Sequence, residues 1–268
     1  MFSGTPCIRL SRVVPGNAGA VYVKWESLSP HMSGYDRVAE LWAQQVALPA
    51  QVFDAANAAW CISLAAACLR RGVTLNVFVP EGTPLEARQA MQLLKAKVTL
   101  TPASEGVWGA MARARQAGPL VQESHHALFA QAHRATADEL RAHVEAEGGR
   151  IDALVCGAST GGLWTACAHM VRSAFPSAVC VAARVDGDAL VPHLDAALAP
   201  QWVVVPAPEA KAMRTALATQ EGMLLSAAQG AVVAAAVAQA VKVGQDARIF
   251  AVVGEGGERT LSVDAVSC

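Results

Sequence analysis

Apolar runs of strand length alternate along the chain with longer segments in which apolar residues recur every three or four positions. The expected strands cover residues 21–26, 50–56, 73–80, 97–103, 151–159, 178–185, 201–208 and 247–255. The expected helices cover residues 33–46, 57–72, 83–96, 106–117, 136–148, 160–175 and 209–222. Continuous apolar strands that alternate with helices are typical of parallel sheets covered by helices on both faces. The pattern therefore predicts an α/β fold with mostly parallel sheets.

The most apolar segment, residues 221–241, is hydrophobic enough to resemble a membrane span. Glu221, Gln229 and Gln239 interrupt it and small residues dominate, which favours a helix buried against a sheet. The chain has 268 residues, of which 53% are hydrophobic and 16% charged, enough for a large core divided between two lobes. We therefore expect no membrane association.

Charge and cysteine usage narrow the class of protein further. The formal net charge is −1, so no basic surface for nucleic acid is expected. The seven cysteines are scattered, none forms a C-x-x-C pair, and several lie in apolar runs. This pattern is typical of buried free thiols in a reducing compartment. Because the start of the chain also lacks a signal-peptide pattern, the sequence predicts a cytoplasmic protein.

The strongest local signal is "LVCGASTGGLW", residues 154–164, in which a buried strand meets a glycine-rich turn that opens a helix. Backbone N–H groups at such a turn, aided by the helix dipole, can bind phosphate or another anion. The hydroxyls of Ser159 and Thr160 could add donors, while Gly161 and Gly162 would allow close approach. The alternative is a tight turn whose glycines serve packing only.

Three other stretches contain residue types suited to chemistry. In "VFDAANAAW", Asn57 is expected to cap a helix, with or without a ligand. In "VGEGGERTLS", Glu255 and its neighbours Glu258 and Arg259 either position a ligand or form a solvated turn with a local ion pair. "ESHHALFAQAH" contains three histidines, but no nearby carboxylate or cysteine completes a metal signature, so no metal site is predicted.

A further stretch, "SPHMSGYDR" (residues 29–37), places Tyr35 at the start of an expected helix. Taken together, these stretches resemble the fold-type-II pyridoxal-phosphate (PLP) enzymes, the cysteine synthase (O-acetylserine sulfhydrylase) or tryptophan-synthase-β-like family. "SPHMSGYDRVA" is similar to the family pattern N-P-x-G-S-x-K-D-R-x-A, "GASTGGL" to its phosphate loop G-x-G-T-G-G-T, and "EGMLLSAAQGAVVAAA" to E-G-x-x-x-G-x-S-S-G-A. "VVGEGGERTLS" is similar to P-D-x-G-E-R-Y-L-S, and two further segments match in the same order.

The resemblance implies a two-lobed architecture. Residues 1–29 and 131–268 would form a large lobe and residues 30–130 a small lobe. It also implies a homodimer.

The residues that differ from the family pattern stand at positions where the family binds its cofactor and substrate. The aligned stretch puts Tyr35 at the lysine that forms the Schiff base, and a phenol cannot replace an amine there. The loop that binds the substrate carboxylate, T-S-G-N-T-G in the family, reads "DAANAA" here, with Asp54 adding negative charge near the carboxylate position. Ala228 and Gln229 occupy the two serine positions near the cofactor ring. Ser159 replaces a glycine of the phosphate loop.

These losses, on a retained scaffold, favour a pseudoenzyme that binds a protein partner or a small anionic ligand. The partner could be a second copy or a related active enzyme. No covalently bound cofactor is expected, although PLP or a phosphate-like anion could still bind the loop. One alternative is an enzyme with new, PLP-independent chemistry built on Tyr35, Asp54, Asn57 and Gln229, in which a nearby cation would lower the pKa of Tyr35. The other is a residual PLP-dependent β-elimination or β-replacement enzyme that uses Lys24, the nearest of five lysines.

Overall fold

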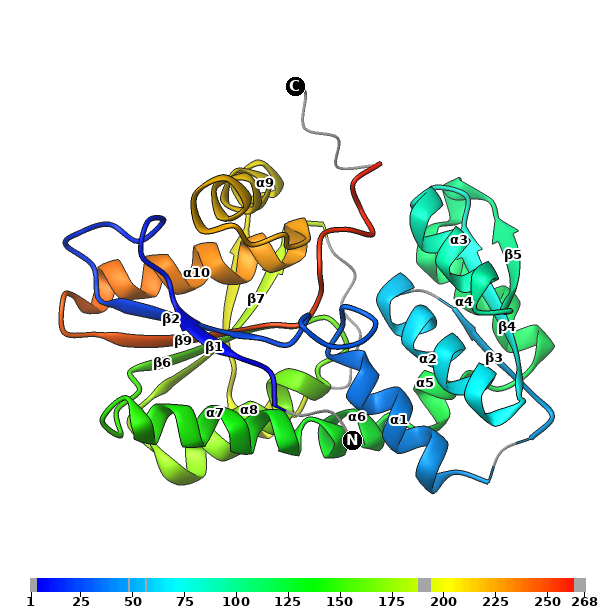
Figure 1. Cartoon of the computed structure of the whole chain (residues 1–268), viewed down its shortest axis with the longest axis horizontal. Coiled ribbons are helices and arrows are strands. Elements are labelled where there is room, and N and C mark those ends of the chain that lie inside the picture. Colours follow the sequence, from blue (N-terminus) through cyan, green and yellow to red (C-terminus); the bar gives the residue numbers. More distant parts are fainter. Residues whose placement is uncertain (1–3, 48, 56, 188–193, 263–268) are drawn as a thin grey trace.

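The strands form two separate sheets (Figure 1). The computed structural model describes residues 4–47, 49–55, 57–187 and 194–262. The larger sheet has the order β1-β2-β9-β6-β7-β8, with β1 antiparallel to β2 and the other pairs parallel. Its strands are β1 (Cys7–Arg9), β2 (Ala20–Trp25), β6 (Ala153–Gly157), β7 (Val179–Val185), β8 (Gln201–Val205) and β9 (Arg248–Val253). The smaller sheet is parallel, with the order β3-β4-β5: β3 (Gln51–Ala55), β4 (Thr74–Pro80) and β5 (Lys97–Thr101).

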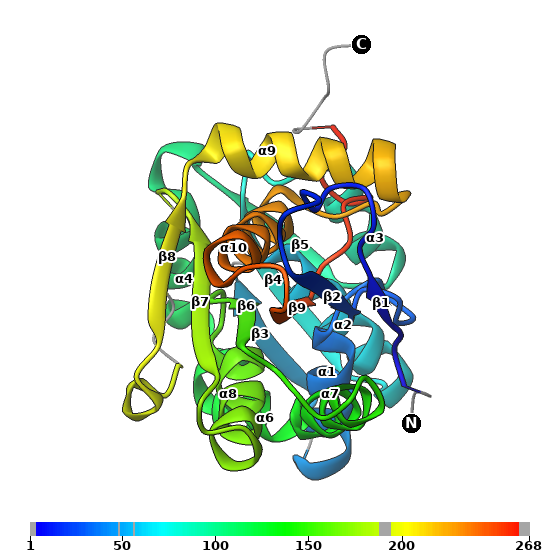
Figure 2. The ribbon, with the colours of Figure 1, turned by 90° about the vertical axis from the view of Figure 1, so that its left-hand side faces the viewer.

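Helices cover both faces of the larger sheet, as Figures 1 and 2 show from two directions. One face carries α10 (Ala227–Val243), with α9 (Ala207–Ala216) packed on it. The other face carries α8 (Gly162–Ala174), which packs on α7 (Arg134–Ala146). The smaller sheet lies between α4 (Gly106–Ala117) and α2 (Ala58–Arg71), and α2 also contacts α1 (Tyr35–Gln45) and α3 (Leu85–Leu93). The short helices α5 (Val121–Ser124) and α6 (Ala127–Ala132) lead from the smaller sheet towards α7.

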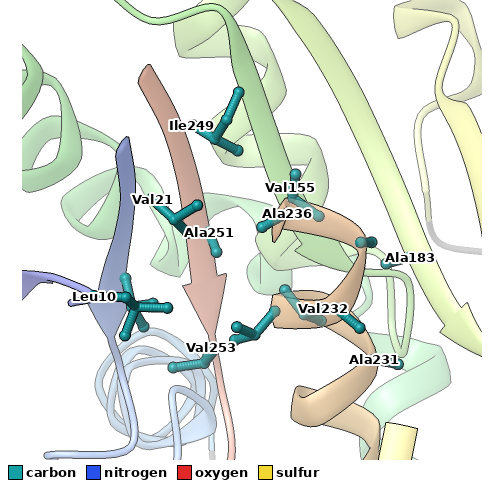
Figure 3. Packing of buried hydrophobic residues seen from close by; sticks show 14 of the residues in the cluster. Leu10, Val21, Val155, Ala183, Ala231, Val232, Ala236, Ile249, Ala251 and Val253 are labelled. Carbon is teal, nitrogen blue, oxygen red and sulfur yellow. The ribbon is translucent and has the colours of Figure 1, made fainter. Parts of the chain in front are cut away.

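The core beneath α10 explains why its sequence is apolar on almost every side. Val232 and Ala236 of this helix face Val155, Ala251 and Val253 of the sheet (Figure 3), and all five are fully buried. A helix that is hydrophobic all round is buried rather than amphipathic. No helix in the described part of the chain is both long and apolar enough to span a membrane.

The predicted α/β fold is confirmed, and each expected strand is present within a few residues. The antiparallel strand β1 was not predicted, because three residues are too short to show an alternating pattern. The stretch that contains the three histidines forms two short helices, α5 and α6. The six described cysteines are unpaired, and five of them are buried.

Candidate functional site

A small cavity lies at the carboxyl ends of β6 and β9, beside the first residue of α1. Ligands of parallel α/β sheets commonly bind at this edge. The cavity volume is about 30 Å³. It is lined by Gly34, Tyr35, His133, Gly157, Ser159, Thr160, Gly161, Leu163, Gln229, Gly254 and Glu255. Of the predicted site residues, the cavity brings together Tyr35, Gln229 and most of the glycine-rich turn.

Tyr35 is the first residue of α1, and its ring is buried at the cavity. The ring packs edge-on against Trp60 and Phe129, with centroids 6.0 and 6.1 Å away. Gly34 precedes it, where a Cβ would lie 3.3 Å from Cε1 of His133 and 3.4 Å from Cβ of Glu26. A larger residue at position 34 would therefore press on both side chains. This close packing sets where the Tyr35 phenol projects.

The phenol of Tyr35 is hydrogen-bonded to the glycine-rich turn. Its Oη lies 3.0 Å from Oγ of Ser159 and donates to Oγ1 of Thr160 at 3.4 Å. Burial raises the pKa of Tyr35 above its ordinary value of 10, and the nearby Glu255 raises it further. The lowered Tyr35 pKa that the PLP-independent alternative requires is therefore wrong, because the shift is in the opposite direction. Tyr35 is thus a neutral hydrogen-bonding group.

The glycines of the turn are required by geometry. Gly161 has φ of 80°, in the left-handed region that glycine adopts most easily. A Cβ at Gly162 would lie 2.4 Å from Cβ of Phe129, so α8 can approach α6 only with glycine there. Packing thus accounts for Gly162. The N-terminus of α8 still lies at the cavity, because its N-cap residue Gly161 is part of the lining.

Asn57 has the predicted capping role and a second contact across the site. Its Oδ1 accepts from the backbone N–H groups of Ala59 and Trp60 at 2.9 and 3.3 Å. Its Nδ2 donates to Oε1 of Glu255 at 3.0 Å and to Oγ of Ser159 at 3.4 Å. Asn57 itself does not line the cavity; it holds two residues that do.

Gln229 lies in the first turn of α10 and is buried at the cavity. Its Oε1 accepts from the backbone N–H of Gly254 at 2.9 Å. This bond fixes the loop after β9 and turns the Nε2 group away from Gly254. The prediction that Gln229 belongs to the cleft agrees with its position in the lining.

Asp54 does not line the cavity, although the sequence suggested a charge there. Its Oδ2 accepts from Nε1 of Trp60 at 2.9 Å and from the backbone N–H of Gln122 at 3.0 Å. It therefore joins β3 to α2 and α5. Burial raises its pKa to about 7, against the opposing effect of these hydrogen bonds. Ala56, two residues on, lies outside the described residues.

The sequence analysis missed His133 as a cavity residue. It was considered only as a metal ligand, and no group of three or more metal-binding side chains exists within the described residues. His133 is 2% exposed, and burial lowers its pKa to about 4. Its Nδ1 lies 3.3 Å from Oγ1 of Thr136, which in turn donates to Oε2 of Glu26 at 2.9 Å. The imidazole is therefore neutral and oriented by a buried carboxylate.

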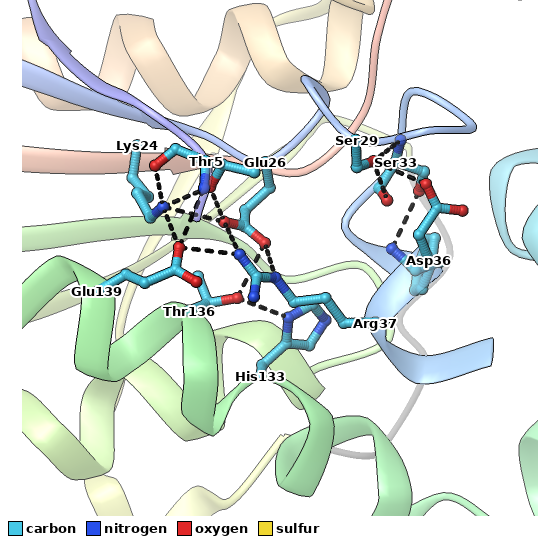
Figure 4. A network of polar contacts seen from close by, with 11 residues as sticks. Thr5, Lys24, Glu26, Ser29, Ser33, Asp36, Arg37, His133, Thr136 and Glu139 are labelled. Atoms are coloured by element: carbon cyan, nitrogen blue, oxygen red, sulfur yellow. Dashed lines mark hydrogen bonds and ion pairs between the residues drawn. The ribbon is translucent and has the colours of Figure 1, made fainter. Parts of the chain in front are cut away.

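Glu26 belongs to a buried charge network behind the site (Figure 4). Arg37 donates to it at 2.8 Å and to Glu139 at 2.9 Å. Nζ of Lys24 lies 2.5 Å from Glu139 and 3.4 Å from Glu26. Burial favours a higher pKa for Glu26, but Arg37 and Lys24 outweigh it and hold the pKa at about 2. Lys24 is thus an ion-pair partner in this network and does not line the cavity.

The residues present do not fit a lysine-bound PLP. None of the described residues that line the cavity is a lysine, and the position at the start of α1 carries a phenol. The hydroxyls of Ser159 and Thr160, which could face a phosphate, are bonded to that phenol. The cavity has room for about two water-sized groups, far less than the cofactor.

Comparison with known proteins agrees with the sequence resemblance. The family described as "Pyridoxal-phosphate dependent enzyme" matches residues 2–201. A cysteine synthase of Staphylococcus aureus is 26% identical over 300 aligned positions, which cover 100% of this chain and 96% of the relative.

Two solved structures share the fold. An O-ureido-L-serine synthase matches with a TM-score of 0.86 and 24% identity, over 98% of this chain and 93% of that one. A hydrogen sulfide-producing enzyme from Fusobacterium nucleatum matches with a TM-score of 0.84 and 20% identity, over 95% and 96%.

The fold and the cavity at the strand ends define a fold-type-II PLP-enzyme architecture. The chain belongs to the pyridoxal-phosphate dependent enzyme family and is similar to cysteine synthases. Membership implies PLP as the cofactor of the family, whereas this chain carries Tyr35, Ser159 and Gln229 in the site.

Proposed function

We propose that this chain is a pseudoenzyme of the PLP family, a protein that has lost the family's cofactor chemistry and acts by binding. One observation carries the proposal. The Tyr35 phenol is buried and hydrogen-bonded to Ser159, within a cavity whose described lining contains no lysine. Because Schiff-base chemistry requires an amine, this arrangement does not support covalent attachment of PLP.

The test is to add PLP to the purified protein and follow absorbance in the visible region, with borohydride to trap any lysine adduct. Wild-type protein is expected to show no lysine-bound band and no trapped adduct. Tyr35→Lys restores an amine at this position and is expected to gain the band, while Tyr35→Phe is the matched control without an amine. A band in wild-type protein that borohydride traps on a lysine would refute the proposal.

A second candidate function is an enzyme with PLP-independent chemistry in the same cavity. The observation that favours it is the convergence of Tyr35, His133 and Glu255 on one enclosed space. A neutral imidazole can accept a proton and a neutral phenol can donate a hydrogen bond. Turnover of a small metabolite that Tyr35→Phe abolishes, without loss of folding, would select this candidate.

The third alternative, a residual PLP-dependent enzyme of cysteine metabolism that uses Lys24, has the least support. Lys24 is 1% exposed and its ammonium group is bonded to Glu139 and to the backbone carbonyl of Thr5. Releasing it would leave buried carboxylates without a partner, which is costly. Borohydride trapping on Lys24 would nevertheless decide for this alternative.

The binding role includes a protein partner, either a second copy of this chain or a related active enzyme. The support is the resemblance to a family for which a dimer is expected. Light scattering on the purified chain distinguishes a monomer from a homodimer. Co-expression with an active cysteine synthase, followed by affinity capture of one tagged chain, tests the heterodimer; a monomer that captures no relative would contradict this part of the proposal.

A further inference from the structure

The cavity carries few charged groups for a site whose glycine-rich turn resembles a phosphate loop. None of its described lining residues is a lysine or arginine, and Glu255 places a carboxylate there. That charge is felt by Tyr35, whose pKa it raises. Arg259 interacts with Glu255 from outside the lining. The N-terminus of α8, a helix of 13 residues, brings partial positive charge to the opposite side. An anion would be repelled by the carboxylate of Glu255, and a cation would be repelled by the N-terminus of α8.

The hydroxyl groups of the site form a directed series. Asn57 donates to Ser159 at 3.4 Å, and Tyr35 donates its single proton to Thr160 at 3.4 Å. Oη of Tyr35 therefore accepts the proton of Ser159 at 3.0 Å. The proton of Thr160 is left to point into the cavity that this residue lines. Thr160 thus presents a hydrogen-bond donor to a ligand.

A second donor comes from Gln229. Its Oε1 is taken by the backbone N–H of Gly254, so its amide orientation is fixed. Within the described part of the chain, its Nε2 group has no hydrogen-bond partner. The side chain lines the cavity and is only 6% exposed. Its N–H groups are therefore available to an acceptor in the cavity.

His133 supplies an acceptor. Because Thr136 gives its only hydroxyl proton to Glu26, its Oγ1 can only accept from the imidazole. This arrangement places the proton of His133 on Nδ1 and leaves a lone pair on Nε2. Nε2 has no partner among the described residues, and the ring lines the cavity. A ligand that carries a hydrogen-bond donor would be accepted here.

Size limits the ligand as strictly as polarity does. A volume of about 30 Å³ admits about two or three non-hydrogen atoms. We propose that the cavity binds a small neutral molecule that carries both a donor and an acceptor, of the primary-amide class. Its N–H would bond to Nε2 of His133, and its carbonyl oxygen would accept from Thr160 and Gln229. This inference rests on the proposed binding function and names the ligand class for it.

Three probes of nearly equal shape test the proposal: formamide, which is neutral, formate, which is an anion, and formamidinium, which is a cation. A ligand of three non-hydrogen atoms reaches a Kd of about 1 mM at best. At 20 mM, formamide is expected to raise the Tm of the wild-type protein by about 3 °C through mass action. Formate and formamidinium are expected to change the Tm by less than about 1 °C at matched ionic strength.

Variants separate binding in the cavity from general solvent effects. Gly34→Ala adds a methyl group 3.3 Å from Cε1 of His133 and should remove the formamide effect by filling space. Thr165→Val is the matched control, since it removes a buried hydroxyl of α8 that bonds to Asp195 away from the cavity. It should keep the full effect of formamide.

Thr136→Val tests the tautomer. Without Thr136, the proton of His133 is free to move to Nε2, so the formamide affinity is expected to fall about tenfold. Nitrogen NMR of the histidines should show the Nδ1–H form in wild-type protein and a mixture in this variant. If affinity and tautomer are both unchanged in Thr136→Val, His133 is not the acceptor and the proposal is wrong.

The outcomes are distinct from those of the PLP test. Stabilisation by formate or inorganic phosphate but not by formamide would show that an anion site survives, and would overturn the ligand class while the pseudoenzyme proposal stands. Stabilisation by formamidinium alone would show that the negative charge of Glu255 determines which ligand binds. This result would also overturn the ligand class while the pseudoenzyme proposal stands. Equal effects of formamide on wild-type protein and Gly34→Ala would place its action outside the cavity and overturn the inference.

Discussion

Asn57 and Glu255, 198 positions apart in the chain, are joined by a hydrogen bond of 3.0 Å. Asn57 also caps α2 beside the smaller sheet, while Glu255 follows β9 of the larger sheet. One amide side chain therefore both begins a helix and holds that helix to the other sheet across the cavity.

Two substitutions of Asn57 separate these roles. Asn57→Asp keeps an oxygen that caps α2 but places a carboxylate against Glu255. It is expected to destabilise the protein at neutral pH and to recover below about pH 4, where carboxylates take up protons. Asn57→Ala loses the cap as well, about 1 kcal/mol, and should not recover in acid. Urea unfolding at pH 7 and pH 4 measures both; parallel behaviour of the two variants would contradict the bridging role.

Tyr35→Phe removes the hydroxyl that bonds to Ser159 and Thr160. The expected loss is about 1 kcal/mol in the free energy of unfolding, since a buried hydrogen bond is broken and its partners stay buried. Tyr22→Phe is the matched control in a chain with two tyrosines, because its hydroxyl bonds to Glu147 nearer the surface. Chemical denaturation should show the smaller loss for Tyr22→Phe. An equal or larger loss there would mean that the Tyr35 contacts contribute little.

Met32 holds a backbone conformation that normally belongs to glycine. Its φ is 54°, and the family pattern N-P-x-G-S has glycine at this place. Its side chain is 43% exposed, so little packing would be lost with it. Met32→Gly is therefore expected to stabilise the protein by about 1 kcal/mol.

The converse control is Gly72→Ala, at φ of 68° with open space around it, which should destabilise by a similar amount. Thermal unfolding of both variants provides the measurement. Destabilisation by Met32→Gly would show that packing of the Met32 side chain stabilises the protein by more than its backbone conformation costs.

Two buried groups titrate in opposite directions between pH 7 and pH 4. The pKa of His133 is lowered from 6.5 to about 4, so its contribution to stability is present above pH 6.5 and is lost as pH falls towards 4. The pKa of Asp54 is raised from 3.8 to about 7, so its contribution is present below pH 4 and is lost as pH rises through 7. The contributions amount to about 3 kcal/mol for His133 and about 4 kcal/mol for Asp54, so the two are expected largely to offset each other in wild-type protein.

Single variants should uncover each titration. Acidification from pH 7 to pH 4 is expected to stabilise His133→Leu and to destabilise Asp54→Asn, relative to the nearly level wild type. His169→Asn, at an exposed position, is the control and should follow wild type. Urea midpoints across this range measure the effect. Below pH 4.5 a further loss is expected in all of them, because the pKa of Glu26 is held at about 2.

The alternation of apolar runs and amphipathic segments was enough to predict the sheets and helices, because central parallel strands such as β6 and β9 are buried on both faces. The site was only partly predictable. Tyr35 and Ser159 were found from their places in the motifs, but Asp54 was misplaced. Its side chain, near the end of β3, turns towards α5, and this direction depends on how strand and helices pack. His133 carries no local signal beyond its residue type, since its role comes from residues 26 and 136.

The charge network behind the site has a consequence for how the chain can change. Glu26 and Arg37, at the two ends of the segment that carries Tyr35, are bonded to each other at 2.8 Å. The segment between them is thereby closed into a loop by an ion pair that does not involve the side chain at position 35. The residue at position 35 can therefore be exchanged while the ion pair that closes the segment stays intact, so a change of side chain here does not require a new scaffold.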